Sequence, residues 1–322
     1  MIMKLHTWQL SILTLLASGA ANPCLAAPLA YSTNEGSGTV SVIDTASDEV
    51  IDTFPVGDKP RGAAITPNGE IMYVSDQPHN SLVVIDLARR NVISSTKLSS
   101  SPEGVGISHD GKWVVVANEE DNSVSFVDTA SHLEAFKIKM QGKNPEHAEF
   151  SPDGKWLYVT AEEGEHVDVV DVVDVEARKS IKLVKVGLRP RGIGFLPDGS
   201  RVYVACENSN MVAVLDIKTH EVVAAIPVGN RSNGVTVHPS GKKVFVTNGG
   251  DANVSVIDTA TNKVKITIPV GKRPWNMAIT PDGKKLYVPN GKSNSVTVID
   301  AEKDIPIKDI PVGLTPWGVF VF

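Results

Sequence analysis

The sequence predicts an all-β protein, a seven-bladed β-propeller built of four-stranded antiparallel blades. The first observation is a repeat in which an Asp ends a Val-rich run, and successive Asp residues lie 42 or, once, 46 positions apart. The second is a strand-entry landmark, usually a Pro, that recurs with the same period. The third is the absence of helical periodicity. Self-similarity at this period is typical of propeller blades.

The number of blades follows from how often each landmark occurs. The Asp landmark occurs at Asp44, Asp86, Asp128, Asp174, Asp216, Asp258 and Asp300. The strand-entry landmark occurs at Pro60, Pro102, Pro145, Pro190, Ser232, Pro274 and Pro316. Seven of each predict seven blades in a single domain over residues 27–322.

Each repeat predicts four short strands in the same order. In the first full repeat, residues 61–67 form the first strand, and the tight turn at Asn68-Gly69 uses the dihedral freedom of Gly. Residues 70–76 and 81–86 form the second and third strands. Residues 91–98 alternate more loosely, as expected of an outer edge strand.

The two ends of the chain predict how the ring closes. Residues 316–322 supply only a first strand, whereas residues 29–56 supply a second, third and fourth strand. Together they complete a seventh blade, which ties the ring without a disulfide.

Residues 1–26 have the features of a secretory signal peptide: Lys4 near the start, an apolar run over residues 10–17, and small residues before Ala26. We expect this segment to be cleaved and the mature chain to be periplasmic or secreted. No later apolar run has the length of a membrane span, so we expect no transmembrane segment in the mature chain. We also expect a monomer.

The charge and cysteine content exclude some classes of function. The chain has 37 acidic and 31 basic residues, a formal net charge of −6. An acidic protein is a poor match for the phosphate backbone, so we expect no nucleic-acid partner. Of Cys24 and Cys206, only Cys206 remains after cleavage, and the chain has no Cys-x-x-Cys-His site for haem attachment.

The segments YVSD, YVTA, YVAC, FVTN and YVPN, beside SVIDTA and PVGKRP, resemble the YVTN-type β-propeller repeat family. The resemblance extends over residues 27–322. Within that family the chain is similar to exported propellers associated with catabolism that depends on pyrroloquinoline quinone (PQQ). This resemblance implies the fold and a setting in quinone-dependent periplasmic oxidation, and it does not determine an activity.

The repeated residues have structural explanations. The seven Asp landmarks are expected to cap the turn that follows each third strand through hydrogen bonds to backbone N–H groups. The Tyr or Phe that begins each YV segment is expected to pack between neighbouring blades.

The informative positions carry different side chains on the same scaffold. Because the first strand is innermost, the residue after each strand-entry landmark is expected at the mouth of the central channel, on the face that also carries the turns between second and third strands. Around the ring these residues are Arg61, Glu103, Glu146, Arg191, Asn233, Trp275 and Trp317. The next position is Gly in five blades, but it is His147 or Asn276 in the other two. Polar and aromatic groups that converge on a concave mouth are typical of a ligand site. The alternative is that these positions vary without a function on a solvated rim, where their charges pair locally.

Trp275, Trp317 and Arg61 come from consecutive blades, so they predict an aromatic wall with a cation beside it. An anionic or planar ligand would fit such a wall. Glu103, Glu146 and His147 are expected toward the other side. Neighbouring residues of a strand point to opposite faces, so Glu146 and His147 are not expected to act on one atom.

Acidic residues also end the second strands, at Glu35, Asp76, Glu119 and Glu207, and a longer loop in the third blade adds Glu162, Glu163, Glu165 and His166. Carboxylates are ligands for Ca²⁺. These acids are scattered among blades, however, so we expect a solvated acidic rim. We predict no metal site, no cofactor and no catalytic residue.

We therefore expect an exported binding or accessory protein rather than an enzyme. As the resemblance implies, its partner is a periplasmic quinone-dependent dehydrogenase or a cytochrome; a small anionic or planar ligand is the other candidate. Three alternatives stay open: a lactonase-like hydrolase, a haem-binding propeller with His147 or His166 as axial ligand, and a surface or adhesion module.

Overall fold

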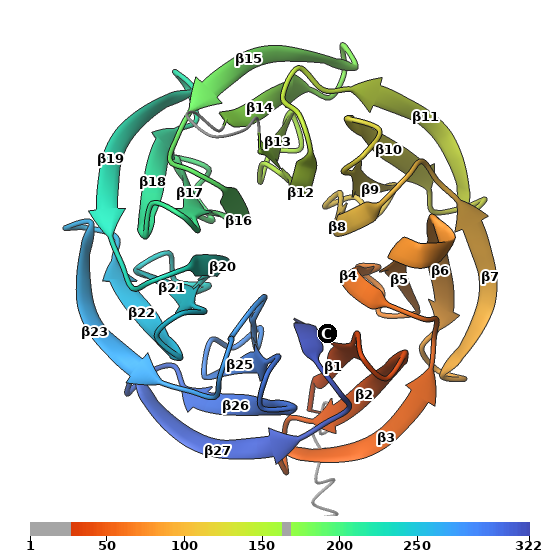
Figure 1. The fold of residues 1–322 in the computed structure, drawn as a ribbon, viewed down its shortest axis with the longest axis vertical. Helices are drawn as coiled ribbons and strands as arrows, with labels where there is room; N and C mark the ends of the chain where they lie inside the picture. Colours follow the sequence, from red (N-terminus) through yellow and green to blue (C-terminus); the bar gives the residue numbers. More distant parts are fainter. Residues whose placement is uncertain (1–26, 163–168) are drawn as a thin grey trace, which may run out of the picture.

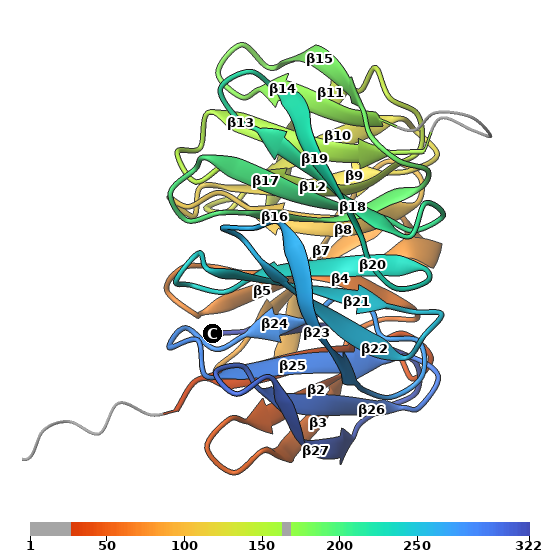
Figure 2. The same cartoon turned by 90° about the vertical axis from the view of Figure 1, so that its left-hand side faces the viewer.

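Seven four-stranded antiparallel sheets surround a central channel in the computed structural model, which describes residues 27–162 and 169–322 (Figure 1). In each blade the first strand lies next to the channel and the fourth forms the outer rim. Seen edge-on, the inner strands run between the two faces of the ring (Figure 2). The predicted fold class is confirmed. Residues 1–26, predicted as a signal peptide, and residues 163–168 of the long third-blade loop lie outside the described residues.

The strands of the first three blades follow the predicted repeat. Blade 1 contains β4 (Pro60–Ile65), β5 (Ile71–Asp76), β6 (Ser81–Asp86) and β7 (Asn91–Lys97), with a short 3₁₀ turn, η1 (Gln77–His79), between β5 and β6. Blade 2 contains β8 (Pro102–Ile107), β9 (Trp113–Asn118), β10 (Ser123–Asp128) and β11 (Leu133–Lys139). Blade 3 contains β12 (Pro145–Phe150), β13 (Trp156–Ala161), β14 (Val169–Asp174) and β15 (Lys179–Lys185).

The next three blades repeat this order. Blade 4 contains β16 (Pro190–Phe195), β17 (Arg201–Cys206), β18 (Met211–Asp216) and β19 (Glu221–Pro227). Blade 5 contains β20 (Ser232–Val237), β21 (Lys243–Asn248), β22 (Asn253–Asp258) and β23 (Lys263–Pro269). Blade 6 contains β24 (Ala278–Ile279), β25 (Lys285–Asn290), β26 (Ser295–Asp300) and β27 (Ile305–Pro311).

Blade 7 joins the two ends of the described chain, as predicted. Its inner strand is β28 (Pro316–Val321), followed outward by β1 (Leu29–Asn34), β2 (Thr39–Asp44) and β3 (Glu49–Pro55). β28 pairs antiparallel with β1, and the N–H of Leu29 donates to the carbonyl of Phe322 at 2.8 Å. Hydrogen bonds between the two ends therefore close the ring.

The Asp landmarks cap turns in all seven blades, as predicted. Each accepts a hydrogen bond from a backbone N–H two or three residues later, for example from Ala46 to Asp44 at 2.8 Å and from Thr261 to Asp258 at 2.8 Å. Such local bonds hold the turn between the third and fourth strands.

The hydrophobic core is a set of layers between neighbouring blades. One layer packs Val40 and Val42 of blade 7 against Met72 and Val74 of blade 1, and equivalent layers fill the other blade interfaces. The YV tyrosines lie in these interfaces, as predicted. Their hydroxyls reach the next blade: that of Tyr287 donates to Asp48 at 2.5 Å.

The inner strands approach one another so closely that most of them need a Gly after the mouth residue. A Cβ added at Gly62 would lie 2.5 Å from the carbonyl oxygen of Glu103 in the next blade. Blade 6 has Asn276 at this position. There the Asn276 N–H donates to Trp317 of blade 7 at 3.3 Å, and its carbonyl accepts from Val319 at 2.9 Å. This bonding to the neighbouring blade explains why β24 is short. Among the residues that the structure describes, no helix is long and apolar enough to cross a membrane.

Candidate functional site

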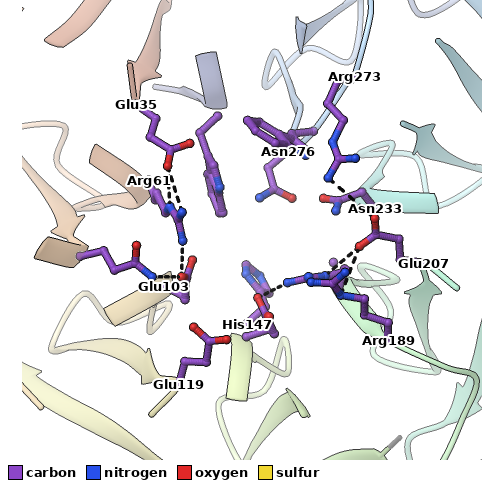
Figure 3. A pocket seen from close by; sticks show the side chains of 16 residues that line it. Glu35, Arg61, Glu103, Glu119, His147, Arg189, Glu207, Asn233, Arg273 and Asn276 are labelled. Atoms are coloured by element: carbon purple, nitrogen blue, oxygen red, sulfur yellow. Dashed lines mark hydrogen bonds and ion pairs between the residues drawn. The ribbon is translucent and has the colours of Figure 1, made fainter. Parts of the chain in front are cut away.

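The nine residues predicted for the mouth all line one pocket at the predicted end of the channel, which we call the mouth pocket (Figure 3). They are Arg61, Glu103, Glu146, His147, Arg191, Asn233, Trp275, Asn276 and Trp317. The pocket has a volume of about 250 Å³. These side chains therefore lie together at the channel, as the sequence predicted. A binding role for them stays a prediction.

A break in strand pairing helps to aim these side chains at the channel. The register between inner and second strand shifts just after the entry residue, for example between Pro60 and Ala63 and between Pro190 and Ile193. Such a bulge bends the strand and reorients nearby side chains.

Two further sets of residues line the mouth pocket and were not predicted for it. Glu35, Gln77, Glu119 and Glu207 each follow the end of a second strand. Arg189 and Arg273 directly precede a strand-entry Pro and have left-handed backbone conformations, with φ of 57° and 58°. An Arg at this position in three consecutive blades, at 189, 231 and 273, was visible in the sequence as a signal for the second set.

The expectation of a solvated acidic rim was wrong, because several of these acids are buried and paired with arginines. The side chain of Glu207 is 1% exposed and that of Glu35 is 15% exposed. Asp76, by contrast, does not reach the pocket; its carboxylate accepts a hydrogen bond from the backbone N–H of Lys59 at 3.1 Å. Among the residues with described positions, no group of three or more His, Cys, Asp or Glu is placed to hold a metal ion.

One half of the mouth pocket is an acidic cluster around Arg61. Its Nε and Nη2 donate to Oε1 of Glu35 at 3.1 and 2.9 Å, and its Nη1 pairs with Glu103. Gln77 also donates to Glu103 Oε1, at 2.7 Å. Burial raises the pKa of Glu103 to about 7, although Arg61 lowers it. Near neutral pH, Glu103 is therefore a carboxyl that gains or loses a proton beside a fixed cation.

The other half is an arginine cluster around the buried Glu207. Arg191 Nε donates to Glu207 Oε2 at 3.1 Å, and Arg231 Nη2 donates to Oε1 at 2.6 Å. Arg189 and Arg273 lie 3.6 and 3.8 Å from the same carboxylate. Figure 3 shows Arg189, Glu207 and Arg273 on the side opposite Glu35, Arg61 and Glu103. The mouth is thus electrically polarised.

Arg191 also joins the arginine cluster to Glu146 and Glu162. Its Nη1 pairs with Glu146 and its Nη2 lies 3.1 Å from Glu162 Oε1. Burial raises the pKa of Glu146 more than Arg191 lowers it, and the charge of Glu103 raises it further. A protonated Glu146 leaves four arginines facing Glu207 and Glu162, so this half carries surplus positive charge.

Glu146 and His147 both face the mouth pocket, contrary to the alternation expected of a regular strand. The register shift between Pro145 and His147 accounts for the difference, because a bulge interrupts strict alternation. The two side chains have different partners. Glu146 pairs with Arg191, whereas His147 Nε2 lies 3.6 Å from Glu149 Oε2. His166, the other histidine considered as a haem ligand, lies outside the described residues.

Trp275 and Trp317, the two residues of the predicted aromatic wall, line the pocket from blades 6 and 7, and Asn276 and Asn233 line it as well. The indole of Trp275 packs over Gly291, where an added Cβ would lie 2.8 Å from the ring. The guanidinium of Arg273 lies 5.5 Å from the centre of the Trp275 ring. A flat aromatic face therefore adjoins the arginine cluster. The cation predicted beside this wall, Arg61, is instead bound to two carboxylates.

The raised pKa of Glu103 makes stability depend on pH in a specific direction. Between about pH 4.5 and 7 the folded state holds the Glu103 proton more tightly than the unfolded state does, so the free energy of unfolding falls as the pH rises. We expect Glu103→Gln to remove this loss, which is on the order of 3 kcal/mol. Urea unfolding of both proteins at pH 5 and pH 8 measures it. A pH dependence that is the same in both would contradict the prediction.

Comparisons with known proteins agree with this fold. A family model described as a YNCE-like β-propeller matches residues 154–280, and one described as a seven-bladed lactonase β-propeller matches residues 26–134. Each model covers less than half of the chain. No curated protein sequence matches the chain.

Solved structures match over most of the chain. Hydrazine synthase of Kuenenia stuttgartiensis has a TM-score of 0.79 and 23% identity, with 89% of this chain and 99% of that chain covered. A putative 6-phosphogluconolactonase of Bacteroides uniformis has a TM-score of 0.75 and 17% identity, covering 92% and 99%. The dihydro-haem d1 dehydrogenase NirN has a TM-score of 0.66 and 16% identity, covering 91% and 74%. At these identities the likeness shows the fold alone. The chain is thus a seven-bladed β-propeller, similar over separate parts of its length to the YNCE-like and lactonase propeller families.

Proposed function

We propose that this protein is an exported binding protein that holds a small anionic ligand with a flat group in the mouth pocket. The observation that carries this proposal is an arginine cluster with surplus positive charge beside the indole of Trp275. The planar guanidinium fork is well suited to carboxylates, and an indole offers a stacking face.

Arg273 is the residue best placed to meet the anion. It lies 3.8 Å from Glu207, and the structure gives its guanidinium no hydrogen bond to any described residue. Burial, and then the positive charge of Arg231, lower its pKa. A ligand carboxylate beside Arg273 in the mouth pocket would offset this positive charge.

The size of the mouth pocket supports a small ligand. Its volume of about 250 Å³ lies below the roughly 300–1,000 Å³ of sites that hold drug-sized molecules. A haem macrocycle is correspondingly disfavoured, even though His147 lines the pocket.

For the setting, we propose export and a part in quinone-dependent oxidation, as the resemblance to PQQ-associated propellers implies. When the full-length sequence is expressed in a Gram-negative host, we expect fractionation to recover the protein in the periplasm with residues 1–26 removed. A pull-down from a periplasmic extract would then identify a dehydrogenase or cytochrome partner. Retention in the cytoplasm at full length would contradict export.

Binding of benzoate, measured by calorimetry, tests the proposed ligand class. We expect benzoate to bind at least about tenfold more tightly than uncharged benzamide, since charge-assisted bonds are the stronger ones. It should also bind more tightly than cyclohexanecarboxylate, which keeps the charge and loses the flat ring.

Arg273→Gln should weaken benzoate binding by about tenfold, the loss of one charge-assisted contact. The matched control is Arg89→Gln, because the Arg89 side chain is 77% exposed and pairs with Asp86 in a local turn. Equal binding by both variants and the natural chain would exclude the mouth pocket as the site.

Glu103 supports a second candidate, a hydrolase of the lactonase type. A carboxyl whose pKa is about 7 is suited to general acid–base catalysis, and the partial lactonase match covers Glu35, Arg61 and Glu103. Turnover of δ-lactones that is lost in Glu103→Gln would support this candidate. Turnover that does not differ between the variant and the natural chain would exclude Glu103 as its catalytic group.

A further inference from the structure

A second cavity continues the channel below the mouth pocket and has the opposite chemistry. This lower chamber has a volume of about 330 Å³. Its walls are mainly apolar side chains of the inner strands, including Ile65, Ile107, Val235, Met277 and Phe320. Contiguous apolar surface that stays open is a common mark of a ligand site.

Bulky apolar side chains of the innermost strands stay partly exposed to this chamber. Close packing of inner strands explains Gly and Ala next to the channel, as at Gly62. The larger Ile65, Ile107 and Phe320 pack against the layers between blades, yet they stay partly exposed although they lie on the innermost strands. Their exposed surface faces the lower chamber.

The two cavities meet at a waist. His147, Gly192, Asn276 and Trp317 line both of them. His147 and Asn276 are visible within the ring of mouth side chains in Figure 3. They occupy the position that is Gly in the other five blades, so two of the four waist residues are departures from the repeat.

We propose that the mouth pocket and the lower chamber form one site for an amphipathic acid. Its anionic, flat head lies against Arg273 and Trp275, and an apolar tail passes the waist into the lower chamber. This inference rests on the proposed function for the head and adds the tail. The chamber's volume of about 330 Å³ far exceeds the roughly 10–15 Å³ that a single water requires, so it has room for a tail of several methylene groups.

Calorimetry with benzoate and its 4-ethyl, 4-butyl and 4-hexyl derivatives tests the tail. Burial of each methylene should raise the affinity about fourfold, and the heat capacity change on binding should become more negative with chain length. The 4-hexylbenzyl alcohol, which has the tail without the charge, should bind at least about tenfold more weakly than 4-hexylbenzoate.

The double variant Ile65→Thr/Ile107→Thr keeps β-branched side chains in both strands and makes the chamber wall polar. We expect it to reduce the gain per methylene to about twofold or less, measured as the slope of affinity against chain length, so that any effect on benzoate itself cancels. The control is Ile51→Thr/Ile93→Thr, because these residues are 47% and 45% exposed on the outer strands β3 and β7.

The outcomes separate the two proposals. Benzoate binding without any gain from the tail would overturn the lower chamber as a site and leave the proposed function standing. Failure of every acid in the series to bind would overturn both. If the Ile65→Thr/Ile107→Thr variant does not fold, the heat capacity change on binding to the natural chain is the deciding measurement. A heat capacity change that is the same for all chain lengths would overturn the inference.

Discussion

Removal of residues 316–322 is expected to unfold the protein at temperatures at which the intact chain is stable. These residues form β28, the inner strand of blade 7, which pairs with β1 from Ala30 to Asn34. The deletion leaves the inner edge of β1 without its hydrogen-bond partners and removes Val319, which is 1% exposed, from the layer between blades 6 and 7. The lost hydrogen bonds and buried surface together approach the ~5–15 kcal/mol that stabilises a typical domain.

Thermal unfolding followed by circular dichroism measures this effect. Deletion of Phe322 alone is the control, since it removes two hydrogen bonds to Leu29 but leaves β28 and its pairing with β1 from Ala30 to Asn34. We expect a far smaller decrease in Tm for the control than for the full deletion. A midpoint that the loss of residues 316–322 leaves unchanged would contradict closure of the ring by the two ends.

Arg191→Met is expected to lower the free energy of unfolding by about 3–5 kcal/mol. Arg191 is the cation that contacts Glu146, Glu162 and Glu207 together. Without it, the buried carboxylate of Glu207 loses one of its nearest partners. The unbranched Met side chain keeps most of the volume, so the change reports chiefly on charge.

Substitution of Glu146, the carboxyl partner of Arg191, should change the free energy of unfolding much less. Burial already favours the protonated form of Glu146, so Glu146→Gln should change stability by less than about 1 kcal/mol near neutral pH. Arg191→Lys should recover part of the loss, because it restores the charge without the planar fork. Urea unfolding of the three variants measures these differences. Equal destabilisation by Arg191→Met and Glu146→Gln would mean that Glu146 is ionised in the folded protein.

Much of the mouth pocket was predictable because the repeat provides an internal standard. Positions 61, 103, 146, 191, 233, 275 and 317 occupy the same place in seven equivalent blades, so differences among them stand out. Glu35, Glu119 and Glu207 were recognised as a set, yet they were taken for a solvated rim. The burial of Glu35 and Glu207 depends on Arg61 and Arg231 of the neighbouring blades, and no local pattern shows that depth.

The pairing of charges was not predictable for a related reason. Arg61 was expected to stay available beside the two tryptophans, but it binds Glu35 and Glu103. Arg273, one residue before its landmark Pro, takes the place beside Trp275 instead. A left-handed backbone at this residue turns the side chain toward the mouth, and that conformation is not encoded in the identity of Arg itself.

The sequence by itself determined the ring, its seven blades, its closure by the two ends, and which positions meet at the channel. Repeats at one fixed period must fold alike, and hydrophobic alternation with turn residues defines each strand. Only the tertiary structure decided which acid pairs with which arginine, that Glu146 and His147 face the same pocket, and that an apolar chamber lies beneath a charged mouth. These features arise from contacts between blades about forty residues apart and from a bulge whose geometry depends on the neighbouring strand. They are therefore properties of the assembled ring rather than of any single repeat.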